Sequence, residues 1–173
     1  MDFATRDYIN DSAQQVIRAY NIPIPISDID RAVSRMGGTI EEKKNFDDLC
    51  DGTIIKDGGS SFRIVISPYQ NNRRRLFTIA HELGHLFLHM GFRTNAELWQ
   101  TQDQTVYRRF GSSEQEYQAN EFAASLLMPR EKYREVLKKN AVNGRVDIAT
   151  VAEYFHVSQS AATNRGRFLG YLR

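Results

Sequence analysis

Several features that would place a chain in a specialised class of protein are scarce or absent here. The single cysteine, Cys50, cannot form a disulfide within the chain, so a disulfide-rich secreted fold is excluded and a reducing compartment fits best. No apolar run approaches the length of a membrane-spanning helix, and no basic start followed by an apolar stretch marks a signal peptide. Internal repeats and glycine-rich phosphate loops are also missing. We therefore expect a cytoplasmic protein with no membrane association.

What remains is the composition of an ordinary globular protein. Of 173 residues, 41% are hydrophobic and 25% are charged, which suits one domain with a small appendage. The net charge of +2 is unevenly distributed: residues 130–173 carry nine Lys or Arg against four Asp or Glu, and the rest of the chain has an acidic excess. This asymmetry permits an acidic partner at the C-terminal end.

The most informative segment is His81-Glu82-Leu83-Gly84-His85. Side chains four residues apart lie on the same face of a helix, so both imidazoles can reach one Zn²⁺. Glu82 lies beside the first ligand, where a carboxylate can accept a proton from a zinc-bound water instead of binding the metal. The alternative is a core helix whose histidines bond to backbone carbonyls, because short motifs also match by chance. Gly84 is unfavourable inside a helix, and close approach of a strand or a substrate backbone would be one reason for a glycine there.

A third ligand must come from another part of the chain. His89 lies two helical turns beyond His81, too far to join it at one metal. The segment 113–129 is predicted to be a helix that ends at Pro129. One face of this helix carries a stripe of mostly small residues: Glu116, Ala119, Asn120, Ala123 and Leu127.

Small residues on this stripe would let the second helix lie close to the first. Glu116 would then face the metal, and Asn120, one turn behind it, would hydrogen-bond a ligand. Glu114 and Glu121 are expected to point away into solvent. The alternative for Glu116 is a surface carboxylate on an amphipathic helix.

Together the two motifs resemble the ImmA/IrrE family of metallopeptidases. The first motif is His81 to His85, preceded by Arg75-Leu76-Phe77-Thr78-Ile79-Ala80, and the second is Glu116-x-x-Ala119-Asn120-x-Phe122-Ala123-x-x-Leu126-Leu127-Met128-Pro129. The resemblance covers roughly residues 10–130 and implies a zincin-like fold with a bound Zn²⁺. It also implies that His81, His85 and Glu116 are the zinc ligands. Glu82 is then the general base.

The resemblance implies a biological task as well. Members of this family are expected to cut a helix-turn-helix repressor and so release genes of a mobile element or a stress response. Some relatives are toxin-like partners of such repressors. The substrate class is implied by the resemblance alone.

Turn and pattern signals predict an α+β fold with a zincin-like metallopeptidase domain at 1–129. It comprises N-terminal helices, a small antiparallel sheet and the two metal-site helices. Two strands, Gly52–Lys56 and Ser61–Ile66, flank the turn signal Asp57-Gly58-Gly59-Ser60. Peptidases of this architecture hold their substrate along an edge strand. Phe62–Ile66 is the candidate, and the alternative is a plain structural strand.

The long connection 92–112 has few apolar anchors and joins the two metal-site helices, so it is expected to pass near the cleft. Trp99 in this connection has two interpretations. It either anchors a lid over a peptide side chain or packs onto the domain, and packing is favoured.

Residues 130–173 are predicted to form a helical, helix-turn-helix-like segment. The small, buried, capping and packing positions of such a motif are filled by Ala152, Val157, Ser158 and Ala162. His156 stands where the turn usually has glycine. Arg165 and Arg167 on the second helix are candidates for contacts with a partner or with phosphates. The alternative is a helical cap that packs on the catalytic domain.

These features favour a zinc-dependent endopeptidase that cuts a specific repressor. The main alternative is a non-catalytic regulatory protein that binds a repressor or DNA through residues 130–173, with a structural or vestigial metal site. A toxin-like component that acts by binding is a further alternative. Three protein ligands at the metal would favour catalysis, and a closed site with four would favour a structural role.

Overall fold

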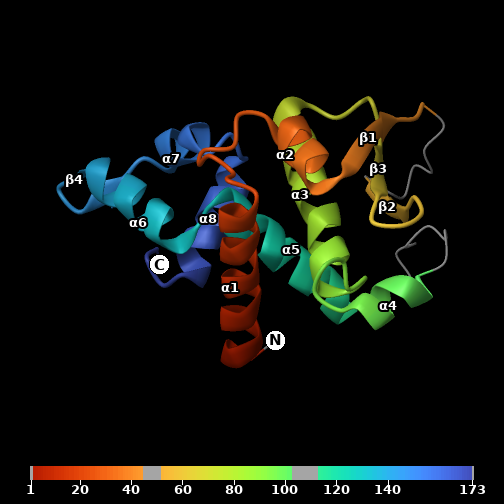
Figure 1. Cartoon of the computed structure of the whole chain (residues 1–173). Coiled ribbons are helices and arrows are strands. Elements are labelled where there is room, and N and C mark those ends of the chain that lie inside the picture. The colour runs from red at the N-terminus through yellow and green to blue at the C-terminus, as the bar shows by residue number, and fades with distance from the viewer. Residues whose placement is uncertain (1, 45–51, 103–112, 173) are drawn as a thin grey trace.

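The computed structural model describes residues 2–44, 52–102 and 113–172, which form the predicted α+β fold (Figure 1). The helices are α1 (Phe3–Ala19), α2 (Ile29–Met36), α3 (Asn72–Leu88), α4 (Ala96–Thr101), α5 (Ser113–Leu127), α6 (Arg130–Lys139), α7 (Ile148–Tyr154) and α8 (Gln159–Phe168). The strands are β1 (Gly38–Glu42), β2 (Gly52–Lys56), β3 (Phe62–Ile66), β4 (Ala141–Val142) and β5 (Arg145–Val146).

Local signals in the sequence fix where the early helices begin and end. The Asp28 side chain accepts a hydrogen bond from the Arg31 N–H at 2.9 Å and begins α2, and Gly37 ends this helix with φ of 91°. Asn71 begins α3 in the same way, through the Arg74 N–H at 2.9 Å. Such a capping side chain contributes about 1 kcal/mol to helix stability. The start of the helix that carries the first motif is therefore encoded locally.

The main sheet has the order β1–β3–β2. β2 and β3 form the predicted antiparallel hairpin, whereas β1 pairs parallel to β3, so the sheet is mixed and not purely antiparallel. The prediction that Phe62–Ile66 is an edge strand for substrate is wrong, because β3 is hydrogen-bonded on both sides. Among the strands of the described residues, β1 and β2 are the outer ones.

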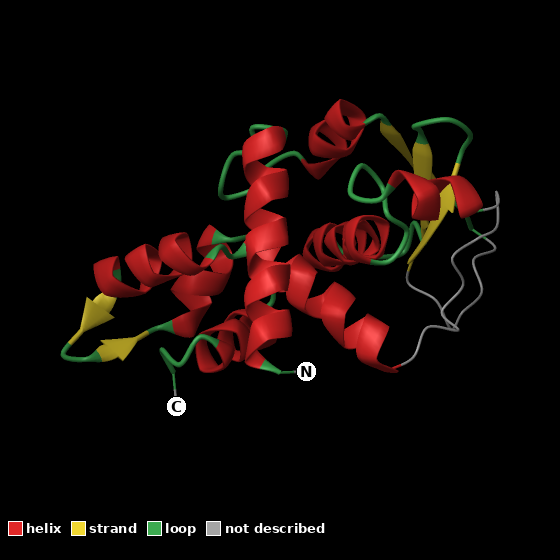
Figure 2. Ribbon diagram, turned by 60° about the horizontal axis from the view of Figure 1, so that its bottom comes forward, coloured by secondary structure: helices red, strands yellow, loops and turns green. Residues whose placement is uncertain are grey.

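The sheet and the C-terminal helices lie at opposite ends of the molecule, with α1, α3 and α5 between them (Figure 1). In Figure 2, α1 lies between the C-terminal helices, which carry the β4–β5 hairpin, and the elements around the main sheet. α5 packs against both α3 and α1. In α3, every residue from Thr78 to Phe87 is buried. A helix enclosed in this way holds its side chains rigidly, which suits a site that needs fixed geometry.

The described part of the 92–112 connection contains a short helix, α4, that was not predicted. Trp99 on this helix donates its indole N–H to the Gly59 carbonyl at 2.7 Å, and its ring meets Phe92 edge-on at 5.0 Å. Lys56 donates to the Trp99 carbonyl at 2.7 Å. Trp99 therefore packs onto the domain, as the favoured interpretation holds. Residues 103–112 lie outside the described residues.

Residues 148–168 have the predicted helix-turn-helix arrangement, with α7 and α8 packed together. Ser158 caps α8 by accepting a hydrogen bond from the Ala161 N–H at 3.1 Å. His156 in the turn has φ of 56°, a left-handed conformation that glycine adopts more readily. The residues at the interior positions of the motif are almost inaccessible to solvent: Ala152, Val157 and Ala162.

The division into residues 1–129 and 130–173 falls at Pro129, in the short break between α5 and α6. That these two ranges are separate domains stays a prediction. Side chains of α8 hydrogen-bond with α1 and α5 across this boundary.

Candidate metal centre

The two histidines of the first motif lie together on the buried face of α3. His81 and His85 are 6% and 2% exposed, and their Nε2 atoms are 3.1 Å apart. This is the arrangement that the four-residue spacing predicts, because one helical turn separates the two side chains. Both imidazoles point their Nε2 atoms at the same place.

α5 brings Glu116 to this place. Its carboxylate oxygens lie 3.4 Å from His81 Nε2 and 3.4 Å from His85 Nε2. The structure therefore brings together all three predicted ligands, which come from two helices that are distant in sequence. Glu114 is exposed, as expected.

Close packing of α5 on α3 depends on Gly84. A Cβ atom at this position would lie 2.9 Å from Ala119 Cα and 3.0 Å from the Ala119 carbonyl oxygen, closer than real side chains allow. The close neighbour is thus a helix backbone and not the strand or substrate predicted from the sequence. Ala119 is one of the small residues of the predicted stripe, and together these two residues set the distance between the metal-site helices.

The spacing of the three side chains fits one zinc ion. Ligand atoms at 2.0–2.1 Å from a tetrahedral Zn²⁺ are separated by about 3.3 Å. The two Nε2 atoms are 3.1 Å apart, and the Glu116 carboxylate faces both rings, with Oε2 at 3.4 Å from His81 Nε2 and Oε1 at 3.4 Å from His85 Nε2. With one ligand atom taken from each residue, the three atoms lie within 4.8 Å of one another. Glu116 Oε1 is also buried without a hydrogen-bond partner among the described residues, which is unfavourable unless a cation binds it. The donor set suits Zn²⁺, which accepts histidine nitrogen and carboxylate oxygen.

Asn120 lies behind the first ligand. Its Oδ1 atom is 3.1 Å from His81 Nδ1, so it accepts the Nδ1–H hydrogen bond. This leaves the Nε2 atom of His81 without a proton and directed at the metal position. The sequence-based placement of Asn120 behind a ligand agrees with this geometry.

A second support, behind His85, was missed at the sequence level. His89 Nε2 is 2.9 Å from Gln118 Oε1, and His89 Nδ1 is 3.0 Å from His85 Nδ1. If His89 donates to the amide oxygen, its Nδ1 accepts from His85, and His85 Nε2 is then free of a proton. Burial lowers the pKa of His89, which keeps its ring neutral and able to accept. The spacing of His85 and His89 was the available signal, because residues four apart share a helix face.

Glu82 is 2% exposed and lies on the side of α3 that faces the sheet. A Cβ atom added to Gly52 would lie 3.0 Å from Glu82 Oε1 and 2.6 Å from a methyl group of Thr78. Only glycine lets β2 approach α3 so closely. The carboxylate is thus adjacent to the backbone of an edge strand.

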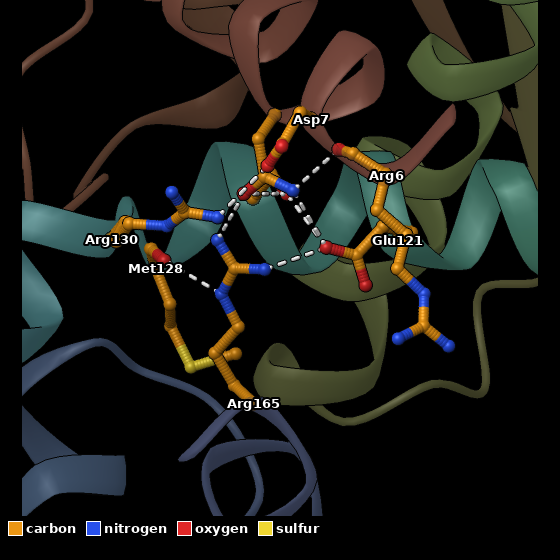
Figure 3. Close-up of polar contacts among 8 residues, drawn as sticks. Arg6, Asp7, Glu121, Met128, Arg130 and Arg165 are labelled. Carbon is orange, nitrogen blue, oxygen red and sulfur yellow. Dashed lines mark hydrogen bonds and ion pairs between the residues drawn. The ribbon is translucent and has the colours of Figure 1, made fainter. Parts of the chain in front are cut away.

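The expectation that Glu121 is solvated is wrong. It is 8% exposed, and its Oε1 atom accepts hydrogen bonds from Arg165 at 2.7 Å, Asn10 at 3.1 Å and Ser125 at 3.2 Å (Figure 3). Burial raises the pKa of Glu121, and the nearby Arg165 guanidinium opposes that rise. α1 and α8 cover this face of α5, and the pattern of a single helix does not reveal such cover.

The prediction that Arg165 contacts a partner or a phosphate directly is also wrong. Arg165 is 2% exposed, and besides Glu121 it donates to Asn10 Oδ1 at 2.8 Å and to the Met128 carbonyl at 3.1 Å (Figure 3). Its charge is neutralised inside the protein, because a buried guanidinium requires partners. Arg167 is exposed on the same helix, and its partner-binding role stays a prediction.

The family model Peptidase_M78, described as the IrrE N-terminal-like domain, matches residues 33–166. The chain belongs to this family. Both metal-site helices lie within the matched range, and the resemblance to the ImmA/IrrE family is confirmed.

A solved structure is also similar to this Peptidase_M78 chain. It is described as a Mycobacterium tuberculosis transcriptional regulator and matches with a TM-score of 0.59 and 18% sequence identity. The match covers 94% of this chain and 50% of that protein, so this chain spans about half its length. At this identity the likeness shows the fold alone. No curated protein matches the chain, and none of its described helices is both long and apolar enough to cross a bilayer.

Proposed function

We propose that this Peptidase_M78 chain is a zinc-dependent endopeptidase that acts in the cytoplasm on a helix-turn-helix repressor-type protein. The observation that carries the proposal is the spacing of His81, His85 and Glu116, which suits one tetrahedral Zn²⁺. Three protein ligands leave the fourth position for water or substrate, as in catalytic zinc sites. A structural site needs four ligands, and the group found among the described residues contains three.

The residues around these ligands have separate tasks in the reaction. His81, His85 and Glu116 would hold a zinc ion, which would supply a Lewis acid to polarise the scissile carbonyl and lower the pKa of the attacking water. Glu82, next to His81 on α3, accepts the proton of that water and returns it to the leaving amine. Asn120 and His89 hold the two imidazoles in the tautomer that binds a metal.

The proposed substrate class rests on the family resemblance. The resemblance of the chain to ImmA/IrrE proteins supports a repressor as the substrate. Cleavage of this repressor would release genes of a mobile element or a stress response. The outer edge of β2 supports an extended substrate segment, since Gly52 on that strand lies against Glu82. A peptide can add to the outer strand of a sheet through backbone hydrogen bonds.

Replacement of the general base tests the proposal. Glu82→Gln keeps the shape of the side chain and the three metal ligands, so we expect zinc content to be unchanged. Cleavage of a co-expressed helix-turn-helix repressor, measured as the appearance of a discrete fragment, should fall about 10²–10⁴-fold.

Glu131→Gln is the matched control, because Glu131 is exposed on α6 away from the metal. It should cut the repressor like the wild type. A regulatory or toxin-like protein that acts by binding alone would release the repressed genes equally well with Gln at position 82, and this result would reject the peptidase mechanism.

A further inference from the structure

A groove with a volume of about 1200 Å³ lies beside the metal centre. Its floor is a face of α5 that includes the exposed Tyr117, and its walls are the start of α3 and the first turns of α8. Asn120 also lines the groove, and the same side chain holds His81. The groove therefore borders the site without containing its three ligands. Its volume exceeds the usual 300–1,000 Å³ of small-molecule pockets, which favours a polypeptide segment as the occupant.

The wall formed by α8 contains the residues that a DNA-binding helix-turn-helix would use to read bases. In such motifs the N-terminal residues of the second helix contact base edges in the major groove. Here Gln159, Ser160 and Asn164 line the groove and face α3 and α5. A helix must protrude to enter a DNA groove, whereas this part of α8 forms one side of a cleft. The arrangement favours a peptide between α8 and the metal-site helices over a duplex.

The charges around the groove favour an acidic peptide. Arg6, Arg73 and Arg74 line it, and Glu114 is the exposed carboxylate among its lining residues. Arg73 pairs with Glu153, which offsets part of its charge. The other lining pair, Arg165 with Glu121, is neutral as a unit and buried. The lining thus keeps a positive excess, to which the N-termini of α3 and α8 add partial positive charge.

Arg6 has capacity for a further partner. Its guanidinium stacks on the Phe168 ring at 4.6 Å, and its Nε atom is buried without a hydrogen-bond partner among the described residues. Figure 3 shows this guanidinium directed away from the Arg165 cluster. Arg6 lines the groove, so the remainder of its guanidinium can donate to a carboxylate oxygen of a ligand bound there.

We infer that this groove is an exosite that binds an acidic peptide segment of the partner protein and so selects which protein reaches the metal centre. The inference rests on the proposed function, because it names the recognition step of the same peptidase. The contribution of residues 130–173 to partner binding then comes from the first turns of α8 and not from the Arg165 guanidinium.

Peptide selection on the intact chain tests this inference. A phage-displayed library of random short peptides is selected on zinc-loaded protein that carries Glu82→Gln, so that no bound peptide is cut. We expect the selected peptides to be enriched in Asp and Glu. Their affinities are then measured by fluorescence anisotropy in the same Glu82→Gln background.

Two groove variants and one control are compared. Arg74→Glu reverses a charge of the lining and Asn164→Trp fills the space beside α8, and each should weaken peptide binding about tenfold or more. Lys138→Glu makes the same charge change at an exposed position of α6 outside the groove and should leave binding unchanged. Zinc content and the unfolding midpoint of each variant show that the fold is intact.

Failure of the exosite and failure of the peptidase give different results. Absence of acidic peptides, or equal affinity in all three variants, would overturn the exosite. The exosite would also be overturned if the groove variants lost binding of a labelled DNA duplex but still bound the acidic peptides. Selective peptide binding by a protein that cuts no repressor would support the exosite and reject only the peptidase. Full repressor cleavage by both groove variants would support the peptidase and reject only the exosite.

Discussion

Arg165 Nη1 donates a hydrogen bond to Glu121 Oε1 at 2.7 Å, and both side chains are almost fully buried. This ion pair connects α8, the last helix, to α5, the helix that carries Glu116. Asn10 of α1 bonds to both partners, so one polar cluster holds three helices together (Figure 3). The C-terminal helices are thereby fixed to the helix that carries the proposed metal ligand Glu116.

Removal of one member of this pair should strongly destabilise the protein. Arg165→Met leaves the Glu121 carboxylate buried without its main partner, and we expect a loss of about 3–5 kcal/mol in the free energy of unfolding. Denaturant unfolding measures it. Arg165→Met combined with Glu121→Leu should recover much of this loss, because no unpaired charge remains. If the single and double variants are equally destabilised, the cost arises from packing and not from the unpaired carboxylate.

Gly84→Ala should weaken both the fold and the metal site. Alanine would gain about 1 kcal/mol of helix propensity, but its Cβ would meet the Ala119 backbone at 2.9 Å. Because backbone atoms cannot move aside as a side chain does, we expect a net loss of about 1–3 kcal/mol from overpacking. The displaced α5 carries Glu116, so zinc affinity should fall as well. Thermal unfolding and zinc competition with a chelator measure the two effects.

Ser34→Ala is the control for that change, since Ser34 is exposed in the interior of α2. Here the propensity gain should appear without a clash, and stability should rise slightly. Unchanged zinc affinity and higher stability in the Gly84→Ala protein would show that α5 is not held by this contact.

The parts of the fold that depend on short-range signals were predictable. The spacing of His81 and His85, the Ser158 cap of α8, and the hairpin between β2 and β3 are each encoded within a few residues. Glu116 was also predictable, because the small residues beside it indicated which face of α5 meets α3.

The errors arise where the environment of a residue is set by distant segments. Glu121 and Arg165 read as surface charges on their own helices, and only the packing of α1 and α8 against α5 buries them together. β3 read as an edge strand because the parallel partner β1 precedes it by a long connection. Periodicity within one element carries no information on which other elements cover it.

Removal of the acceptor behind His85 should weaken zinc binding. His89→Leu leaves His85 Nδ1–H without its partner at 3.0 Å, so the ring is no longer held in the metal-binding tautomer. Loss of such a supporting residue typically costs 10–100-fold in metal affinity. Chelator competition, followed by zinc release, measures this affinity.

His89→Asn separates this role from packing. The Asn oxygen takes a place similar to that of the His89 Nδ1 atom and can accept from His85, so most of the affinity should return. Equal losses in the Leu and Asn variants would mean that His89 acts through packing alone.

The assignment of Glu116 as third ligand leads to the strongest prediction about metal content. Glu116→Ala removes the only carboxylate that lies within 3.4 Å of both motif histidines in the described residues. Two histidines alone hold zinc weakly, since stable sites use three or four protein ligands. We expect purified Glu116→Ala protein to lose most of its zinc, measured by metal analysis after dialysis.

Glu114→Ala is the control, because Glu114 is exposed half a turn away on the same helix, and it should keep about one zinc per chain. Glu121 is not a suitable comparison, because its loss would leave Arg165 buried without its main partner. Full zinc content in the Glu116→Ala protein, with the Glu114→Ala protein equally loaded, would assign the third ligand to a different residue.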